Sequence, residues 1–305
     1  MLVPLSWLSE LVPLGADPTD LASLHALAGV LNGLGLVVEG IEQVPAGPQG
    51  VVLARVLDIR PIGGLDRVRL AIVDAGEGAP LEVACGAWNF AAGDVVPLAT
   101  VGTSLPDGRT IERRPMRGVV SNGMLCSPTE IGAGEDAGGL LVLASTGSPD
   151  GPLPPGMRLG QPLDDYLALH ADAVFDLAIE ANRPDCLCVA GVARDLAGKL
   201  GLPLRLPEPA LAETGRPAGE LASVAVEAPE LCQRLTARVL TGVVAVGSPG
   251  LVARRLRLAG MRPINAVVDA SNYVMLELGQ PTHPYDLDRL HGGLSARRAR
   301  DGESL

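Results

Sequence analysis

The amino-acid sequence predicts an α+β protein of several domains, in which a small β-barrel is accompanied by mixed helical units. At 305 residues the chain exceeds the roughly 250 residues at which single hydrophobic cores usually stop growing. Its apolar pattern has a helical period over residues 21–34 and changes to short β-branched runs over residues 37–144. Two stretches rich in glycine and proline, residues 145–157 and 202–219, separate the later units of the chain.

The first expected element is an amphipathic helix. Residues 21–38 carry no formal charge, and the length of this run is close to the lower limit for a membrane helix. Polar residues and glycines interrupt it, however. We expect Asp17 to be the N-cap, Pro18 to take the first helical position, and Gly33 or Gly35 to end the helix. The first cation of the chain is Arg55, so the basic region of a signal peptide is missing and we expect a cytoplasmic protein. One apolar stripe contains Leu21, Leu24, Leu27, Leu31 and Leu34.

The next expected unit is a small barrel. Its strands are predicted at "VVEGIEQV", "VVLARVLDI", "VRLAIVDA", "LEVAC", "VVPLAT" and "GLLVLA". Five or so strands in about a hundred residues are typical of an OB-type barrel, a fold that often binds single-stranded nucleic acid or oligosaccharide.

Two further helices and several strands are expected after the barrel. A strand at "DAVFDLA" precedes a helix that Asp185 would cap and Gly201 would end. In the last unit, strands at "SVAVEA" and "ARVLTGVVAV" precede a helix that begins at Ser248 and Pro249 and ends at Gly260. This last unit is predicted to be α+β.

The charge pattern limits how the chain could meet nucleic acid. Its net charge is -11, which argues against nucleic-acid binding over the whole surface. A local excess of positive charge lies in "RTIERRPMRG", where one acid, Glu112, stands among four arginines. The cluster could meet phosphates, or it could be a solvated hairpin. The four arginines are Arg109, Arg113, Arg114 and Arg117.

The cysteines do not form a metal-binding pattern. Five cysteines without framework spacing fit a reducing compartment, and "CLC" at residues 186–188 lacks zinc-site spacing, so we expect it in the core and expect no metal site. Cys126 lies in the loop "SNGMLCSPTEIGAGED", which either holds a defined shape or only turns the chain. No base follows Cys126 at a recognisable spacing, so we do not expect a nucleophile there.

Polar residues interrupt an apolar run in "GMRPINAVVDASNYVMLELGQPTHPYDLDRL". Asn265, Asp269, Ser271 and Asn272 need partners if the run is buried, which predicts an internal hydrogen-bond network or a polar pocket. His283 stands between two prolines that would hold its imidazole in place, as a structural hydrogen bonder or as a catalytic group. Of the apolar neighbours, Ile264 is expected to be buried with the valines of the run.

The sequence resembles the β subunits of bacterial phenylalanyl-tRNA synthetases. The resemblance rests on "VPLSWLSELV", "ACGAWNFAAGDVVPLA", "GMLCSPTEIGAGED", "IEANRPDCLCVAGVARDLA" and "GMRPINAVVDASNYVMLELGQPTHPYDLDRL", in order along the chain. It implies an N-terminal α+β domain at residues 1–39 and 151–204, an inserted OB-type tRNA-binding domain at residues 40–150, and the start of a B3/B4-type editing domain at residues 205–305. The rest of that domain and of the family's pattern would lie beyond Leu305, so this sequence would be a fragment or a truncated product.

The resemblance also implies an activity and partners. The whole enzyme would use ATP and Mg²⁺, with no site evident in this segment, to attach phenylalanine to tRNA(Phe). It would pair with an α subunit in an (αβ)₂ tetramer, with no membrane or DNA partner. His283, Asn272 and Ser271, which stands where the family usually has threonine, would belong to a pocket that hydrolyses mischarged Tyr-tRNA(Phe). Two alternatives are a non-enzymatic tRNA-binding module acting in trans and a structural scaffold for a partner subunit.

Overall fold

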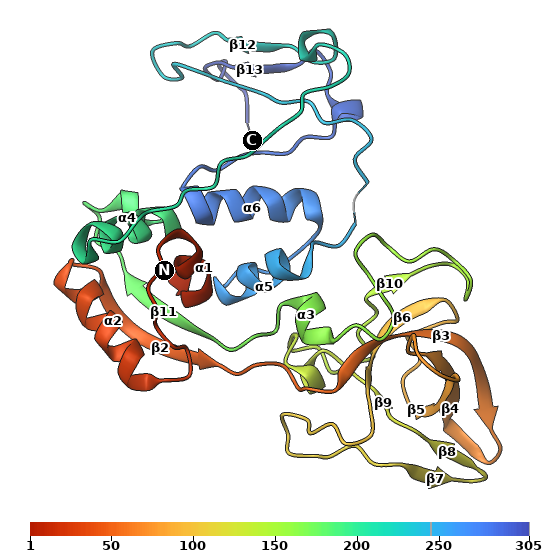
Figure 1. Ribbon diagram of the computed structural model, residues 1–305. Helices are drawn as coiled ribbons and strands as arrows, with labels where there is room; N and C mark the ends of the chain where they lie inside the picture. The colour runs from red at the N-terminus through yellow and green to blue at the C-terminus, as the bar shows by residue number, and fades with distance from the viewer. Residues whose placement is uncertain (245, 305) are drawn as a thin grey trace.

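The computed structural model describes residues 1–244 and 246–304. Its N-terminal unit is a three-stranded antiparallel sheet in the order β1-β11-β2, covered by helices (Figure 1). The strands are β1 (Leu2–Pro4), β2 (Val37–Val44) and β11 (Asp172–Ala178), and the helices are α1 (Leu5–Leu11), α2 (Leu21–Gly33) and α4 (Val189–Leu200). One apolar cluster joins the sheet to all three helices, with Trp7 and Phe175 fully buried in it.

Helix α2 forms as expected, but its N-cap is Asp20 and not Asp17. The Asp20 carboxylate accepts a hydrogen bond from the backbone N–H of Ala22 at 3.0 Å. Asp17 instead accepts from the backbone N–H and the hydroxyl of Thr19, at 2.8 and 2.7 Å, and so closes a turn before the helix. The apolar stripe is buried at Leu24, Leu27 and Leu31.

Strand β2 was expected in the barrel but belongs to the N-terminal sheet. It pairs with β11 over its whole length, with a bulge between Asp176 and Leu177. Its burial does not alternate strictly, because the bulge shifts which residues face the helices and the strand lies at the edge of its sheet. A strand of this composition fits either sheet, so its sequence did not decide its partner.

The barrel is an antiparallel sheet in the order β10-β6-β3-β4-β5, with β9 also paired to β6. Its strands are β3 (Val51–Ile62), β4 (Leu65–Asp74), β5 (Leu81–Cys85), β6 (Asp94–Ala99), β9 (Met124–Leu125) and β10 (Ala144–Ser145). Neighbouring residues of the central strands face two different apolar clusters: Leu53 and Val95 face one, Ala54 and Val96 the other. Of the expected strand "GLLVLA", only its end is β10, although Leu143 still donates a backbone hydrogen bond to Val95 at 2.8 Å.

A separate hairpin, β7 (Arg114–Met116) and β8 (Val119–Ser121), lies below the barrel in Figure 1. The backbone N–H of Ala84 in β5 donates to the Ser121 hydroxyl at 3.0 Å, which ties the hairpin to the barrel edge.

Helix α4 comes after the 3₁₀ turn η2 (Pro184–Cys186) and ends at Gly201, whose φ of 66° gives the expected left-handed cap. Asp185 does not cap it: no side chain caps α4 within the described residues, and the Asp185 carboxylate pairs with Arg183 instead. Short turns also include η1 (Thr129–Ile131), η3 (Ala218–Glu220), η4 (Leu287–Arg289) and the brief helix α3 (Leu163–Leu167).

The last unit combines α5 (Gly250–Leu258), α6 (Ala266–Leu278) and a parallel pair, β12 (Val224–Val226) and β13 (Leu294–Ala296). The strand expected at "ARVLTGVVAV" is wrong for residues 237–244 and 246, which form no strand in the described structure, and residue 245 lies outside the described part. Val244 there is 72% exposed, because no neighbouring strand of the described chain covers it.

Helices α5 and α6 pack on the N-terminal unit beside α1 (Figure 1). The Trp7 indole N–H donates to the Glu277 carboxylate at 3.0 Å, and the Arg255 guanidinium donates to Glu10 and to the Tyr273 hydroxyl. Across residues 1–244 and 246–304, no helix combines the length and apolar character needed to span a membrane.

Candidate nucleic-acid interface

The arginine cluster found in the sequence lies on the β7–β8 hairpin and the loop before it. Arg117 and Gly118 form the hairpin turn, with φ angles of 44° and 87°. Two positive φ angles in a two-residue turn match the right-handed twist of the paired strands, which makes the hairpin compact. Arg114 stands opposite Ser121 in the ladder, so the hairpin places its arginines at a fixed distance from the barrel edge.

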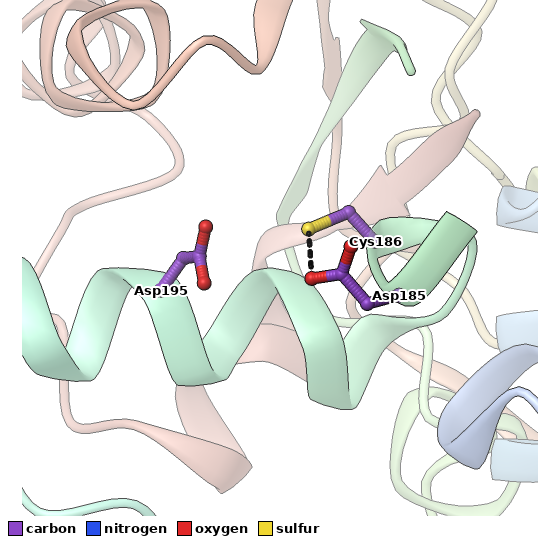
Figure 2. Close-up of side chains that lie close together, drawn as sticks. All are labelled: Asp185, Cys186 and Asp195. Carbon is purple, nitrogen blue, oxygen red and sulfur yellow. Dashed lines mark hydrogen bonds between the residues drawn. The ribbon is translucent and has the colours of Figure 1, made fainter. Parts of the chain in front are cut away.

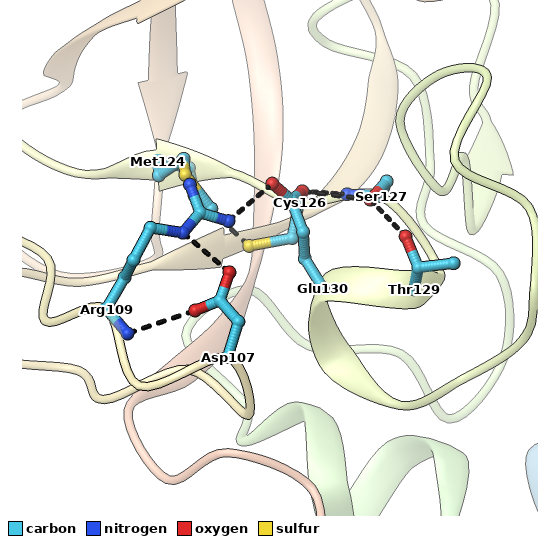
Figure 3. Close-up of polar contacts among 7 residues, drawn as sticks. All are labelled: Asp107, Arg109, Met124, Cys126, Ser127, Thr129 and Glu130. Carbon is cyan, nitrogen blue, oxygen red and sulfur yellow. Dashed lines mark hydrogen bonds and ion pairs between the residues drawn. The ribbon is translucent and has the colours of Figure 1, made fainter.

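Arg109 differs from the other three arginines because it is held by acids. Its Nε donates to Asp107 at 2.6 Å and its Nη2 to Glu130 at 3.2 Å (Figure 3). Glu130 also accepts from the backbone N–H and hydroxyl of Ser127, at 2.8 and 2.9 Å. The hydrogen bond to Asp107 raises the pKa of Arg109 above its usual value. Arg109 is thus paired within the chain although it is 54% exposed, and its contact with Glu130 links it to the loop of residues 121–136.

Arg113, Arg114 and Arg117 are exposed, and no carboxylate in the described part of the chain forms an ion pair with them. Guanidinium groups of this kind suit bidentate contact with phosphate oxygens. These three cations, on the hairpin and the residue before it, form a local positive surface that suits an anionic partner in an otherwise acidic chain.

Cys126 is a core residue and not a nucleophile. It is fully buried, its thiol donates weakly to the Met124 carbonyl at 3.5 Å, and burial raises its pKa to about 12. The thiolate required for attack is thus strongly disfavoured. Its backbone N–H donates to the Pro97 carbonyl of β6. The surrounding loop therefore holds a defined shape against the barrel.

One cluster of possible metal ligands contains Asp185, Cys186 and Asp195 (Figure 2). The Arg183 guanidinium occupies its centre, and its Nη2 donates to Asp195 at 2.5 Å, to the Cys186 sulfur at 2.9 Å and to Asp185 at 3.0 Å. The pKa of Asp185 falls to about 2 through its hydrogen bond with Arg183, while burial raises the pKa of Cys186 to about 12. Two carboxylates already paired with a guanidinium and one neutral thiol are a poor ligand set for a metal cation, so we interpret the cluster as structural.

The sequence did not reveal this cluster, because the pattern predicts Asp185 as a helix cap, Cys186 as part of a core dipeptide and Asp195 as a residue within the helix. The only available signal was an arginine two residues before one acid and twelve before another, a spacing too common to identify a network.

The polar residues of the last unit divide into two groups. Asn265 caps α6 by accepting from the N–H groups of Val267 and Val268, both at 3.1 Å. Asp269, fully buried, accepts from the Ser248 hydroxyl at 2.5 Å and the Ile264 N–H at 2.8 Å. These two residues therefore form the predicted internal network, which builds the start of the helix.

The second group comprises Ser271, Asn272 and His283. The Ser271 hydroxyl bonds to the carbonyl and the hydroxyl of Thr282, both at 2.7 Å, which brings α6 next to the residue before His283. The His283 imidazole is exposed, with its ring centre 6.4 Å from that of Tyr285. Asn272 is half-buried. Ile264, expected to be buried, is instead 67% exposed.

Comparison with known proteins relates these features to named families. The family model "Putative tRNA binding domain" matches residues 51–151, which begin at β3, and the model "B3/4 domain" matches residues 231–305. Along the whole chain, the phenylalanine–tRNA ligase β subunit of Anaeromyxobacter dehalogenans is 44% identical, and that of Geobacter sulfurreducens is 41% identical over 99% of this chain. The chain belongs to the phenylalanine–tRNA ligase β-subunit family.

The β subunit of Bordetella parapertussis is also 44% identical across the whole chain. The chain spans about a third of the length of these relatives, 36% in each case. Within it, the arginine hairpin falls in the stretch similar to tRNA-binding domains, and Ser271, Asn272 and His283 fall in the stretch similar to B3/4 domains. The Arg183 cluster lies between the two stretches.

Proposed function

We propose that this chain acts within a phenylalanine–tRNA ligase and binds tRNA(Phe) through its barrel. The observation that carries the proposal is the β7–β8 hairpin inside the stretch similar to tRNA-binding domains. There Arg113, Arg114 and Arg117 are exposed, and no carboxylate of residues 1–244 or 246–304 pairs with them. Counterion release by phosphate contacts would supply the binding free energy. Arg109, already paired with two acids, contributes by holding the adjacent loop.

The chemistry of the whole enzyme belongs to the same proposal. Together with an α subunit, in an (αβ)₂ tetramer in the cytoplasm, the chain would serve the ATP- and Mg²⁺-dependent attachment of phenylalanine to tRNA(Phe). The described cluster with the spacing of a metal site encloses the Arg183 guanidinium and does not fit Mg²⁺, which prefers oxygen ligands in octahedral geometry. The family resemblance, and not this cluster, supports the proposal that ATP and Mg²⁺ bind in the α subunit.

Ser271, Asn272 and His283 are proposed to form part of an editing site. Tyrosine differs from phenylalanine by a hydroxyl, which an apolar pocket rejects only about a hundredfold, so a second hydrolytic site raises accuracy. The Ser271 link to Thr282 supports this proposal, because it holds the residue before His283 next to α6. From there the imidazole would position water or transfer a proton at the ester. Asn272 would supply an amide for the tyrosine or ribose hydroxyl.

The tRNA proposal is tested by measuring the affinity of the chain for tRNA(Phe) over a series of salt concentrations. The triple variant Arg113→Gln, Arg114→Gln, Arg117→Gln is compared with Arg216→Gln, Arg289→Gln, Arg298→Gln, which removes the same charge from exposed positions outside the barrel. The logarithm of the binding constant is plotted against the logarithm of the salt concentration. We expect the first triple variant to make this slope less steep by about 2–3, and the second triple variant to leave it nearly unchanged. Equal losses would indicate non-specific attraction, and no tRNA affinity in the unaltered chain would favour the scaffold alternative.

The editing proposal is tested in the assembled enzyme with mischarged Tyr-tRNA(Phe). We expect His283→Ala to slow its hydrolysis by about a hundredfold or more, with phenylalanine attachment unchanged. His291→Ala, at another exposed histidine of the same unit, is the matched control. Unchanged hydrolysis in His283→Ala would reduce His283 to a structural role, and a chain that binds tRNA without editing in any assembly would support the trans-acting alternative.

A further inference from the structure

Trp88 is an unusual residue on the barrel surface. The chain has two tryptophans, and aromatic residues make up 2% of it. Trp7 is fully buried in the N-terminal unit, whereas Trp88 is 62% exposed in the loop after β5. An indole left in water forgoes the large stabilisation of its burial. Its place on the surface therefore calls for a role other than packing.

Arg69 fixes the Trp88 ring from one side. The guanidinium carbon of Arg69 lies 4.4 Å from the ring centre of Trp88 and 4.8 Å from that of Phe90. Its Nη2 donates to the Ala87 carbonyl at 3.0 Å, while its Nε is buried with no hydrogen-bond partner in the described structure. The guanidinium is thus held by two rings and one carbonyl. Because it covers one face of the indole, the exposed area belongs to the opposite face and the edges.

Trp88 lies at the same end of the barrel as the arginine hairpin. Cys85 at the end of β5 pairs with Arg69, so β5 runs toward the turn between β3 and β4. An added Cβ at Gly64 in that turn would lie 2.8 Å from the Arg117 guanidinium, which places Arg117 over the turn. At ~3.3 Å per strand residue, Gly64 and Arg69 are roughly 17 Å apart. The exposed Arg67 lies between them on β4, beside the exposed Asp66.

We propose that Trp88 is a stacking position for one unpaired RNA base, with Arg67 and Arg117 contacting the phosphates on one side of it. This rests on the proposed tRNA function and adds the class of nucleotide that the barrel recognises. An exposed aromatic face stacks on any base, but a base inside a duplex is already stacked and out of reach. A ring held in place by Arg69 loses little side-chain entropy when the base binds. The barrel end therefore selects single-stranded segments.

The test uses the full chain with three probes: tRNA(Phe), a single-stranded RNA of about ten nucleotides, and a duplex of equal length. We expect Trp88→Ala to weaken single-strand binding by about 5- to 100-fold and to leave duplex binding unchanged, while Trp88→Phe keeps most of the affinity. Stacking should also quench tryptophan emission in the unaltered chain, and Trp88→Phe should abolish the quenching, since Trp7 is buried.

The outcomes separate this inference from the function on which it rests. In one outcome, the single strand binds and the arginine triple variant weakens that binding, but Trp88→Ala binds as well as the unaltered chain and the tryptophan emission does not change. Stacking at Trp88 would then be wrong, while tRNA binding would stand. If none of the three probes binds, both fail. The quenching measurement needs no substitution, so it decides the matter even if Trp88→Ala does not fold.

Discussion

At Gly191, helix α4 lies close against the turn before it. A Cβ built on Gly191 would lie 1.8 Å from the Asp185 carbonyl oxygen, a backbone atom that cannot rotate away. We expect Gly191→Ala to lower the free energy of unfolding by about 1–3 kcal/mol or more. The measurement is urea unfolding monitored by fluorescence of the nearby Trp7.

Gly198 in the same helix is the matched control for Gly191. It is exposed, and an added Cβ there would meet no atom of the described residues within 4 Å. Gly198→Ala should therefore stabilise the protein by about 0.5–1 kcal/mol through helix propensity. If both substitutions changed stability equally, the close contact at Gly191 would not be a constraint.

The cysteines should differ sharply in reactivity. Burial raises the pKa of Cys126 and Cys186 to about 12, so at about pH 8 their thiolate populations are very small. Cys232 is the half-buried member of the five, the other four being buried. We expect a thiol reagent to modify Cys232 first, and Cys232→Ser to remove that fast phase. Rapid labelling that survives Cys232→Ser would mean that a buried cysteine is accessible.

At the scale of elements, the docking of α6 on α1 depends on a buried polar contact. Trp7 donates to Glu277 at 3.0 Å, and both residues are buried. Glu277→Leu would leave the indole N–H without an acceptor, at a cost of about 1–3 kcal/mol. Glu277→Gln keeps an acceptor oxygen and should cost less. The two variants are compared by thermal unfolding, and equal losses would show that the charge of Glu277, rather than its hydrogen bond, matters.

At the scale of the whole molecule, the apolar core is divided. One cluster joins the N-terminal sheet to α1, α2 and α4, and two others lie within and around the barrel. Separate cores unfold together only when their interface is strongly stabilising. We expect two transitions in urea. In Trp88→Phe, the remaining Trp7 emission reports the N-terminal unit, and far-ultraviolet circular dichroism reports both units. Coincident curves from the two signals would contradict the prediction.

Sequence patterns anticipated most elements but not all of their partners. The helical stripe of α2, the strands β3 to β6 and the left-handed cap at Gly201 were predicted because each depends on neighbours within a few residues. The pairing of β2 with β11 was missed, since it joins strands about 130 residues apart. The sequence also could not separate Arg109, which is paired with acids, from the other three arginines. One of its partners, Glu130, lies 21 residues away along the chain.

The kinds of element, the barrel class and the residues that resemble a known site were predictable before folding, because periodicity, capping residues and motifs are local properties. Folding decides which arginines lack a carboxylate partner in the described chain, that Arg183 fills the carboxylate and thiol cluster, and that Trp88 stands exposed on Arg69 at the hairpin's end of the barrel. Each of these depends on side chains that meet through folding, where burial and charge partners set which groups are still available to a ligand.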